Sequence, residues 1–311
     1  MAEAPVIRTV GLTKSYGRTL ALSDLDLTVE PGEVFGYLGP NGAGKTTTLR
    51  LLMGLLRPTS GQAEVLGLDA WRHSVRVHRD VGYLSGEPAF YRRMTGTQHL
   101  EYFAHLHGDG DTTWGRALGA RLDLDLTRQA TALSKGNRQK LAVVLALMNR
   151  PRLLLLDEPT SGLDPLVQQE FQAMLHEHTD AGGSVLLSSH VLAEVQRLAD
   201  RIGVVRAGRL IAVERLESLR AKSLHHVSAT FADRADPAEF TDLPGVRDLH
   251  VADGTMTCSA PQSSLDELIK RVSRHPVVDF ECAEAELEET FLTYYETSSG
   301  ASTPAGAGHV A

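Results

Sequence analysis

The sequence predicts an α/β fold for about its first 210 residues, and two observations lead to this prediction. Short apolar runs without alternation are typical of strands that are buried on both faces of a mostly parallel sheet. Such runs occur at residues 34–38, 153–157, 184–188 and 202–205. Segments with helical periodicity lie between them, at residues 45–56, 164–179 and 190–199.

Three stretches depart from this pattern and divide the chain further. Residues 6–10 and 20–29 alternate apolar and polar side chains, which predicts an antiparallel β subdomain with one solvated face. Between about residues 94 and 150 helical periodicity dominates, which predicts a helical insertion. After about residue 221 a small α+β domain is expected, with strands at 226–231, 246–251, 255–259 and 277–282 and helices at 264–274 and 287–295.

We therefore expect one large domain over residues 5–225 and a C-terminal accessory domain over residues 226–296. The segment Arg206-Ala-Gly-Arg209 predicts a tight turn between two strands. The last residues, 297–311, consist mostly of Gly, Ala, Ser, Thr and Pro, and this composition predicts a disordered tail.

Composition excludes several classes of protein. With 42% hydrophobic and 23% charged residues among 311, the chain has enough apolar surface for a sizeable core. The longest uninterrupted apolar run, residues 141–148, is too short to span a bilayer, and no signal peptide is visible. Two cysteines provide no disulfide framework, and a net charge of −8 without a basic block disfavours nucleic acid as a partner. We expect a soluble, cytoplasmic protein.

A phosphate-binding loop is the clearest motif in the sequence. Residues 39–46 match the pattern G-x-x-x-x-G-K-[ST], directly after one predicted strand and at the start of a helix. Glycines allow successive N–H groups to point at one anion, and the helix N-terminus adds positive potential. A ligand-free glycine turn would not require the Lys-Thr pair. The predicted ATP contacts are Gly39, Pro40, Asn41, Gly42, Ala43, Gly44, Lys45, Thr46 and Thr47.

Polar residues in this loop and at the ends of two predicted strands indicate which side chains would bind Mg²⁺ and act on ATP. Lys45 can reach the β- and γ-phosphates of ATP, and the Thr46 hydroxyl can ligate Mg²⁺. The buried strand 153–157 ends in Asp157, which is placed to hold Mg²⁺ through water. The next residue, Glu158, is placed to orient or deprotonate the attacking water. His190 follows the strand 184–188.

Taken together, these motifs resemble those of the ATP-binding subunits of ABC transporters, over about residues 5–225 and in the same order. The resemblance implies that Tyr16 stacks on adenine, that Asp164 touches the opposite subunit, and that His190 contacts the γ-phosphate. Tyr16 could also be a surface aromatic, although its position shortly before a turn favours stacking. Without its spacing from Glu158, His190 would more often be a helix cap or a buried core residue. The resemblance also implies a signature segment that contacts ATP across a head-to-tail dimer, made of Leu133, Ser134, Lys135, Gly136 and Asn137.

Three positions in two motifs depart from the usual family pattern. Lys135 and Asn137 replace a Gly and the Gln of Leu-Ser-Gly-Gly-Gln, and this form is similar to that of daunorubicin- and bacitracin-type exporter subunits. Gly86 stands where a Gln normally serves Mg²⁺ and the water, and the adjacent Glu87 is a candidate to replace it. Since Lys45, Glu158 and His190 are all present, we expect hydrolysis.

The resemblance implies an ATPase subunit of a bacterial exporter of a drug, antibiotic or lipid-like compound, with ATP and Mg²⁺ as cofactors. One copy of each motif implies a homodimer or a pair with a related ATPase chain. A separate integral membrane permease would hold it at the inner face of the cell membrane. Two alternatives remain: an importer ATPase, and a regulatory nucleotide-binding module with little turnover, which the presence of Glu158 and His190 disfavours.

Overall fold

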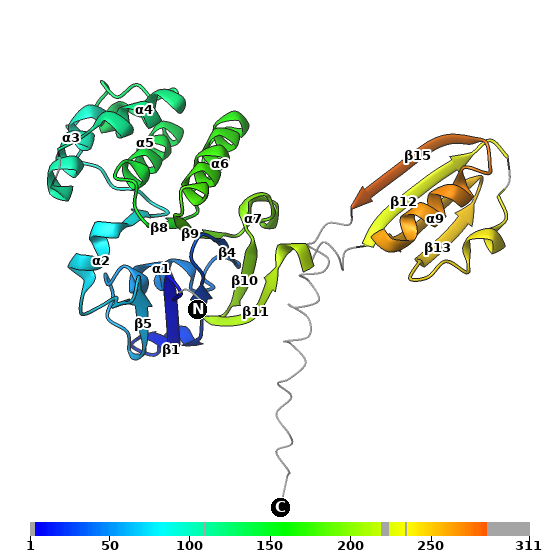
Figure 1. Ribbon diagram of the computed structural model, residues 1–311, viewed down its shortest axis with the longest axis horizontal. Coiled ribbons are helices and arrows are strands. Elements are labelled where there is room, and N and C mark those ends of the chain that lie inside the picture. Colours follow the sequence, from blue (N-terminus) through cyan, green and yellow to red (C-terminus); the bar gives the residue numbers. More distant parts are fainter. Residues whose placement is uncertain (1–3, 109, 219–223, 234, 285–311) are drawn as a thin grey trace, which may run out of the picture. The chain divides into compact units, whose positions relative to one another are not determined.

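The computed structural model describes residues 4–108, 110–218, 224–233 and 235–284, and the chain divides into two compact units, residues 1–214 and 215–311 (Figure 1). The predicted domain boundary, between residues 225 and 226, lies further along the chain than this division. The predicted helix 287–295 and the predicted tail 297–311 lie outside the described residues.

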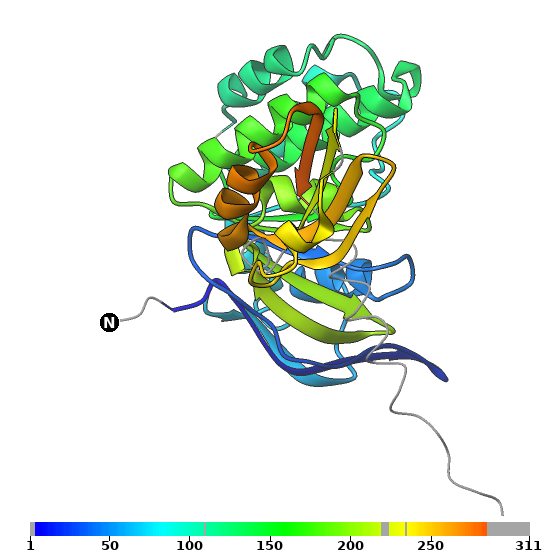
Figure 2. The ribbon, with the colours of Figure 1, turned by 90° about the vertical axis from the view of Figure 1, so that its right-hand side faces the viewer.

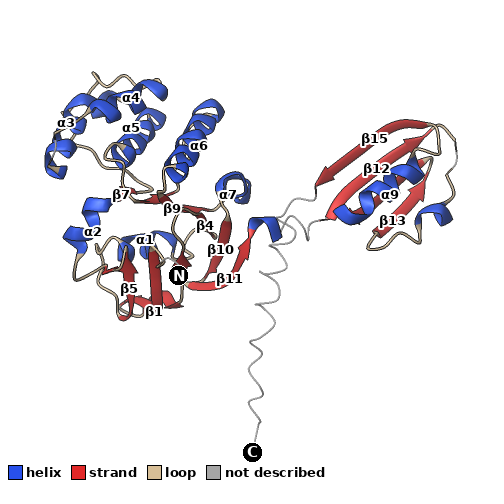
Figure 3. Ribbon diagram, viewed as in Figure 1, coloured by secondary structure: helices blue, strands red, loops and turns tan. Residues whose placement is uncertain are grey.

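A six-stranded, mostly parallel sheet forms the centre of the first unit, and it confirms the predicted α/β class (Figure 3). Its order is β11-β10-β4-β9-β8-β7, and the pairs from β10 to β7 are parallel. All residues of three of its strands are buried, as expected for a sheet covered on both faces. The strands are β4 (Val34–Leu38), β7 (Val81–Leu84), β8 (Leu153–Asp157), β9 (Ser184–Ser189), β10 (Arg201–Arg206) and β11 (Arg209–Arg215).

The tight turn predicted between residues 206 and 209 is confirmed. Ala207 (φ 47°) and Gly208 (φ 76°) both have left-handed backbones, and they connect β10 to β11. Two consecutive residues with positive φ match the turn type that best fits the twist of adjoining strands.

The predicted antiparallel subdomain is a second sheet of five strands in the same unit. Figure 2 shows its blue strands at the bottom of this unit and the green helices at the top. The strands are β1 (Ile7–Tyr16), β2 (Thr19–Leu25), β3 (Thr28–Val29), β5 (Ser60–Val65) and β6 (Leu68–Asp69). The sequence did not predict β5, because its polar sequence lacks a clear apolar pattern. Gly61 explains the pairing, since a Cβ atom there would overlap the backbone of Gly11 in β1.

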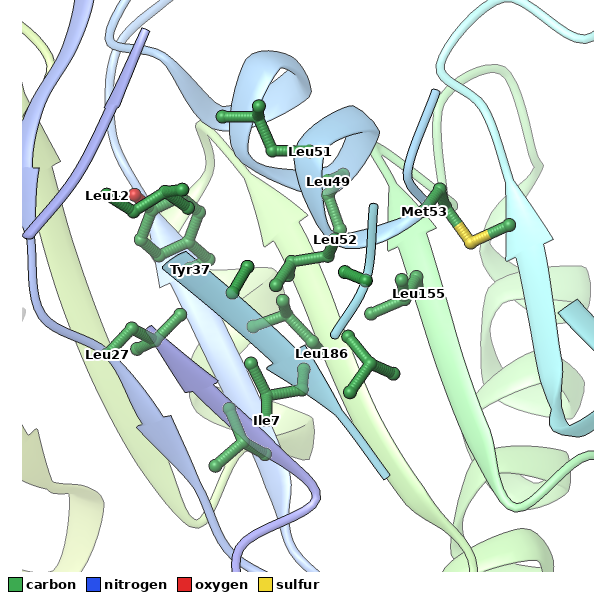
Figure 4. Close-up of a cluster of buried hydrophobic side chains, with 14 of the residues drawn as sticks. Ile7, Leu12, Leu27, Tyr37, Leu49, Leu51, Leu52, Met53, Leu155 and Leu186 are labelled. Carbon is green, nitrogen blue, oxygen red and sulfur yellow. The ribbon is translucent and has the colours of Figure 1, made fainter. Parts of the chain in front are cut away.

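The first helix packs between the two sheets and fills the main core (Figure 4). This helix, α1 (Lys45–Leu52), buries Leu49, Leu51 and Leu52 against side chains from both sheets, including Tyr37. It is shorter than the predicted segment 45–56. Gly54 takes φ 61°, and a Cβ atom there would overlap the backbone of Ala70, so the chain turns away after Leu52.

Helices fill the rest of the first unit, and the predicted helical insertion is confirmed for the described residues between 94 and 150. The regular elements of these residues are helices, apart from one isolated bridge between Thr95 and Gln129. The helices of the first unit other than α1 are α2 (Ser74–Asp80), α3 (Gly96–His107), α4 (Thr113–Arg121), η1 (Ala130–Ala132), α5 (Lys135–Leu147), α6 (Pro165–Asp180) and α7 (Leu192–Leu198). Among the described residues, none of the helices combines the length and the apolarity that crossing a bilayer requires.

The second unit is a four-stranded antiparallel sheet with one helix on its apolar face. Its order is β13-β14-β12-β15, and the core includes Val227, Phe231, Phe240, Met256 and Leu268. Its described elements are β12 (Leu224–Phe231), η2 (Pro237–Phe240), β13 (Arg247–Ala252), β14 (Thr255–Pro261), α9 (Gln262–Val272) and β15 (Val277–Glu284). The four predicted strands and the helix 264–274 agree with these elements within a few residues.

Candidate active site

The phosphate loop connects the buried strand β4 to the helix α1. Gly42 (φ 80°) and Gly44 (φ 107°) adopt left-handed backbones that suit glycine. Gly44 also leaves room for a neighbour, since a Cβ atom there would lie 2.8 Å from the carbonyl oxygen of Ala21 in β2. No side chain caps α1, so the first N–H groups of this helix remain for an anion.

Lys45 points back along the loop and toward the central sheet. Its ammonium donates to the carbonyl oxygens of Gly39 (2.6 Å) and Pro40 (3.3 Å), and it lies 3.2 Å from Glu158 Oε1. The side chain is 6% exposed. A buried cation held by carbonyls and one carboxylate is placed to transfer these interactions to phosphate oxygens.

Thr46 and Asp157 lie side by side although they are far apart in sequence. Thr46 Oγ1 donates to Asp157 Oδ2 (2.7 Å), and Ser188 Oγ donates to Asp157 Oδ1 (2.6 Å). The parallel pairing of β8 with β9 brings Ser188 opposite Asp157. Sequence reasoning did not identify Ser188. The available signal was its place at the end of an apolar strand, but its partner depends on the order of strands in the sheet.

Glu158 has a strained backbone and an available carboxylate oxygen. Its φ of 50° is rare for a residue with a side chain, and its N–H donates to Ser188 O (3.1 Å). His190 Nδ1 donates to Glu158 Oε2 (2.7 Å). The other oxygen, Oε1, is buried and pairs with the Lys45 ammonium at 3.2 Å, but it accepts no hydrogen bond within the described part of the chain. This carboxylate is therefore oriented at one oxygen and has acceptor capacity at the other.

Gly86 lies beside the Asp157 carboxylate. A Cβ atom at Gly86 would be 3.4 Å from Asp157 Oδ2, an ordinary contact, and Glu87 is exposed. The neighbouring Tyr83 faces the same group. Burial raises the pKa of Tyr83 and the Asp157 charge raises it further, while Arg50 lowers it, so the phenol remains protonated.

The geometry at Gly86 permits a direct test of its role. We expect Gly86→Gln to fold and to raise kcat/KM for ATP by about 3- to 10-fold, because the new amide would lie beside Asp157 and help to orient the water. Gly86→Ala is the matched control, because it adds only the Cβ atom. Steady-state ATPase assays compare the three proteins, and a Gln variant no faster than the Ala variant would contradict the expectation.

The signature segment begins α5 and contacts the loop after Glu158. Ser134 Oγ accepts a hydrogen bond from the N–H of Asn137 (3.2 Å) and thereby caps the helix. A Cβ atom at Gly136 would lie 2.9 Å from Gly162 O, and Lys135 packs against Gly162. Leu133 is buried. A side chain that the sequence did not single out, Gln139, donates to Pro159 O (2.8 Å) and ties α5 to this loop.

The other predicted residues lie around this centre. Asp164 is exposed and caps α6, since its Oδ1 accepts from the N–H groups of Leu166 and Val167 (both 3.1 Å). Tyr16 ends β1 and is 47% exposed, with Lys14 Nζ 5.2 Å from its ring centroid. The structure thus brings together Lys45, Thr46, Asp157, Glu158 and His190. It does not bring Leu133, Ser134, Lys135, Gly136, Asn137 or Asp164 to the phosphate loop of the same chain in any described hydrogen bond or ion pair.

Comparison with known proteins identifies the family of this chain. Residues 22–161 match the family model described as ABC transporter. The chain is 32% identical over 235 residues to the bacitracin transport ATP-binding protein BcrA of Bacillus licheniformis, covering 74% of this chain and 76% of that protein. It is 42% identical over 218 residues to the daunorubicin resistance ATP-binding protein DrrA3 of Streptomyces coeruleorubidus, covering 68% and 69%.

Solved structures show the same fold. One, described as the ATP binding subunit of an ABC transporter, aligns with a TM-score of 0.64 and 29% identity, over 70% of this chain and 92% of its own. The dimeric bacterial ABC transporter cassette MJ0796 aligns with a TM-score of 0.63 and 22% identity, over 68% of this chain and 98% of its own.

Proposed function

The chain belongs to the ATP-binding subunits of ABC transporters and is an ATPase, and we propose that it works as a head-to-tail dimer that powers export through a separate membrane permease. The names of the relatives BcrA and DrrA3 support a drug or antibiotic as cargo, and a lipid-like compound is a further candidate. The observation on which the proposed chemistry rests is the set of contacts among Lys45, Glu158 and His190.

We assign the base of the hydrolysis to Glu158. His190 fixes Oε2 at 2.7 Å, which leaves Oε1 to accept a proton from the attacking water. The phosphates of ATP carry several negative charges and would compete with the single charge of the Glu158 carboxylate for the Lys45 ammonium. Lys45 would then stabilise the charge on the transferred group, and His190 would contact the γ-phosphate.

The residues present fit Mg²⁺. Thr46 Oγ1 and Asp157 Oδ2 are hard oxygen donors 2.7 Å apart. The described residues contain no cluster of three or more metal-binding side chains, but Mg²⁺ commonly takes one or two protein oxygens and completes its shell with phosphates and water. When bound, it would neutralise charge on the β- and γ-phosphates. Glu87 remains a candidate for a contact through water.

An exposed apolar surface on the first unit supports a protein partner. Tyr91, Tyr102, Phe103 and Leu106 are large and solvent-exposed, and the Tyr91–Tyr102 and Tyr102–Phe103 ring centroids lie 5.3 and 5.5 Å apart. Contiguous apolar surfaces that are exposed on a protein often mark sites of interaction with another protein. We propose that the permease binds here, at the inner face of the membrane.

The dimer is tested at Ser134. We expect ATP to double the 33.7 kDa mass of the chain in light scattering, and Ser134→Asp to prevent this. Asp is as good a helix cap as Ser, so the variant should fold, but its charge would repel the γ-phosphate of the ATP on the other subunit. Ser134→Asn is the neutral control and should still dimerise. A Ser134→Asp chain that dimerises in ATP like the Asn variant would contradict the head-to-tail arrangement.

A further inference from the structure

A pocket lies in the first unit, at the ends of strands and helices opposite to the phosphate loop. It has a volume of about 480 Å³ and opens between α4, the end of α5 and the end of α6. Figure 1 shows these three helices next to one another. Its walls include Trp114, Leu118, Leu147, Arg150, Met174 and His178. This volume lies within the range of about 300–1,000 Å³ that small-molecule sites occupy.

The charges around the pocket favour an anion. Arg150 and Arg152 both line it, and the Arg152 guanidinium forms no ion pair within the described ranges. The lining carboxylate, Glu177, is already committed, since it accepts hydrogen bonds of 2.6 and 2.7 Å from Arg121. The Arg121 guanidinium also keeps the pKa of Glu177 below its usual value.

Two further titratable groups near Arg150, His178 and Asp111, do not change the balance of charge in the pocket. Burial lowers the pKa of His178, so its imidazole is neutral at pH 7, and its Nε2 atom is buried without a hydrogen bond. Asp111 interacts with the Arg150 charge, but its carboxylate is exposed to solvent and is held mainly by Thr113. The pocket therefore presents two guanidinium groups and no uncompensated buried carboxylate.

The walls favour an apolar or aromatic body on the ligand. Leu118 and Leu147 are buried side chains of α4 and α5, and Met174 comes from α6. The Arg150 guanidinium lies 4.7 Å from the centre of the Trp114 ring. A guanidinium stacked on an aromatic ring is held in a fixed plane and directs its N–H groups outward, which suits a carboxylate or sulfonate.

Three elements lead from this pocket to the residues of the active site. The strand β8 begins beside Arg152 and reaches Asp157 after about 16 Å. The helix α5 runs from Ser134 to Leu147, about 20 Å. From Asp164, the N-cap of α6, to His178 at the pocket is about 21 Å along the helix. A ligand bound between the pocket ends of β8, α5 and α6 would displace these elements. It would thereby affect Glu158, the signature segment and the loop at Asp164 together.

We propose that this pocket is an effector site for a small organic anion with an aromatic or apolar body. The proposal that this pocket binds such a ligand depends on the pocket alone. The proposed effect on ATP turnover rests on the proposed ATPase function. The ligand contacts Arg150 and Arg152 through its anionic group and Leu118, Leu147 and Met174 through its body. Its binding changes the rate of ATP hydrolysis without contact to ATP.

Calorimetry without nucleotide tests the binding. Naphthalene-1-sulfonate is the anionic probe, and 1-naphthylmethylamine is a cation with the same ring system. We expect saturable binding of the sulfonate to one site per chain and at least tenfold weaker binding of the amine. Arg150→Gln should weaken sulfonate binding at least tenfold. Arg116→Gln, on α4 but not among the residues that line the pocket, should leave it unchanged.

ATPase assays with saturating sulfonate test the effect. We expect at least a twofold change in kcat for the wild-type chain and none for Arg150→Gln. No saturable binding, equal binding of the amine, or an Arg150→Gln chain that binds normally would overturn the site. Binding without any change in kcat would overturn its role as an effector site. A chain without ATPase activity at any probe concentration would instead contradict the proposed function. The calorimetry would still show whether the pocket binds the sulfonate.

Discussion

Replacing Glu158 by Gln is expected to lower kcat for ATP hydrolysis by about 10²- to 10⁴-fold, the usual contribution of a positioned general base. Gln has nearly the same shape as Glu, so the contact with His190 can persist, but an amide oxygen does not take a proton from water at neutral pH. ATP binding should remain, because the phosphate loop is unchanged. A variant that binds but does not hydrolyse ATP should accumulate as a closed dimer.

Steady-state phosphate release, with ATP binding measured separately, checks this prediction. Glu64→Gln is a suitable control, because Glu64 is an exposed residue of β5 and the substitution removes the same charge. Turnover of Glu158→Gln at the wild-type rate would mean that another group activates the water.

Replacing Lys45 by Ala is expected to weaken ATP binding by about 10- to 100-fold, since hydrogen bonds to charged groups contribute about 1.5–3 kcal/mol each. The substitution removes the cation that lies 3.2 Å from Glu158 and that is placed to meet the phosphates. In contrast to Glu158→Gln, both affinity and turnover should fall.

Equilibrium binding of a fluorescent ATP analogue measures this loss. The control Lys270→Ala removes an exposed lysine of α9 in the second unit, where its partner is Asp266. Thermal unfolding of each variant identifies any general loss of stability. Unchanged ATP affinity in a folded Lys45→Ala chain would show that the phosphates bind elsewhere.

The sequence alone predicts the phosphate loop because every part of it is local. The strand 34–38, the glycines and the start of the helix are contiguous, and the observed β4 and the start of α1 match them. The same holds for strand 153–157 and the two carboxylates that end it. For these residues, position along the chain is enough to indicate a position at the carboxyl edge of the sheet.

Contacts between distant segments could not be predicted in this way. The hydrogen bond from Ser188 to Asp157 depends on β9 lying between β4 and β8, and no local pattern indicates that order. The contact of Gln139 with Pro159 depends on how α5 packs beside the loop. The pocket at Arg150 could not be predicted either, because its walls come from segments that lie up to about 70 residues apart in the sequence.

Element ends were less predictable than element types. The helix α1 stops at Leu52, before the predicted end at residue 56, and Gly54 just beyond it takes a left-handed backbone (φ 61°). The strand β5 was missed because its residues are mostly polar, and it is defined by pairing with β1.

The central claim is that each ATP site is built from the phosphate loop of one chain and the signature of another. Mixing the Lys45→Ala and Ser134→Asp chains tests it most directly. Each variant alone has no complete site, whereas a mixed head-to-tail dimer has one. We predict that each variant alone has little activity and that an equimolar mixture is several-fold more active than either, since each mixed dimer carries one complete site out of two. A mixture no more active than its separate components would contradict the shared site.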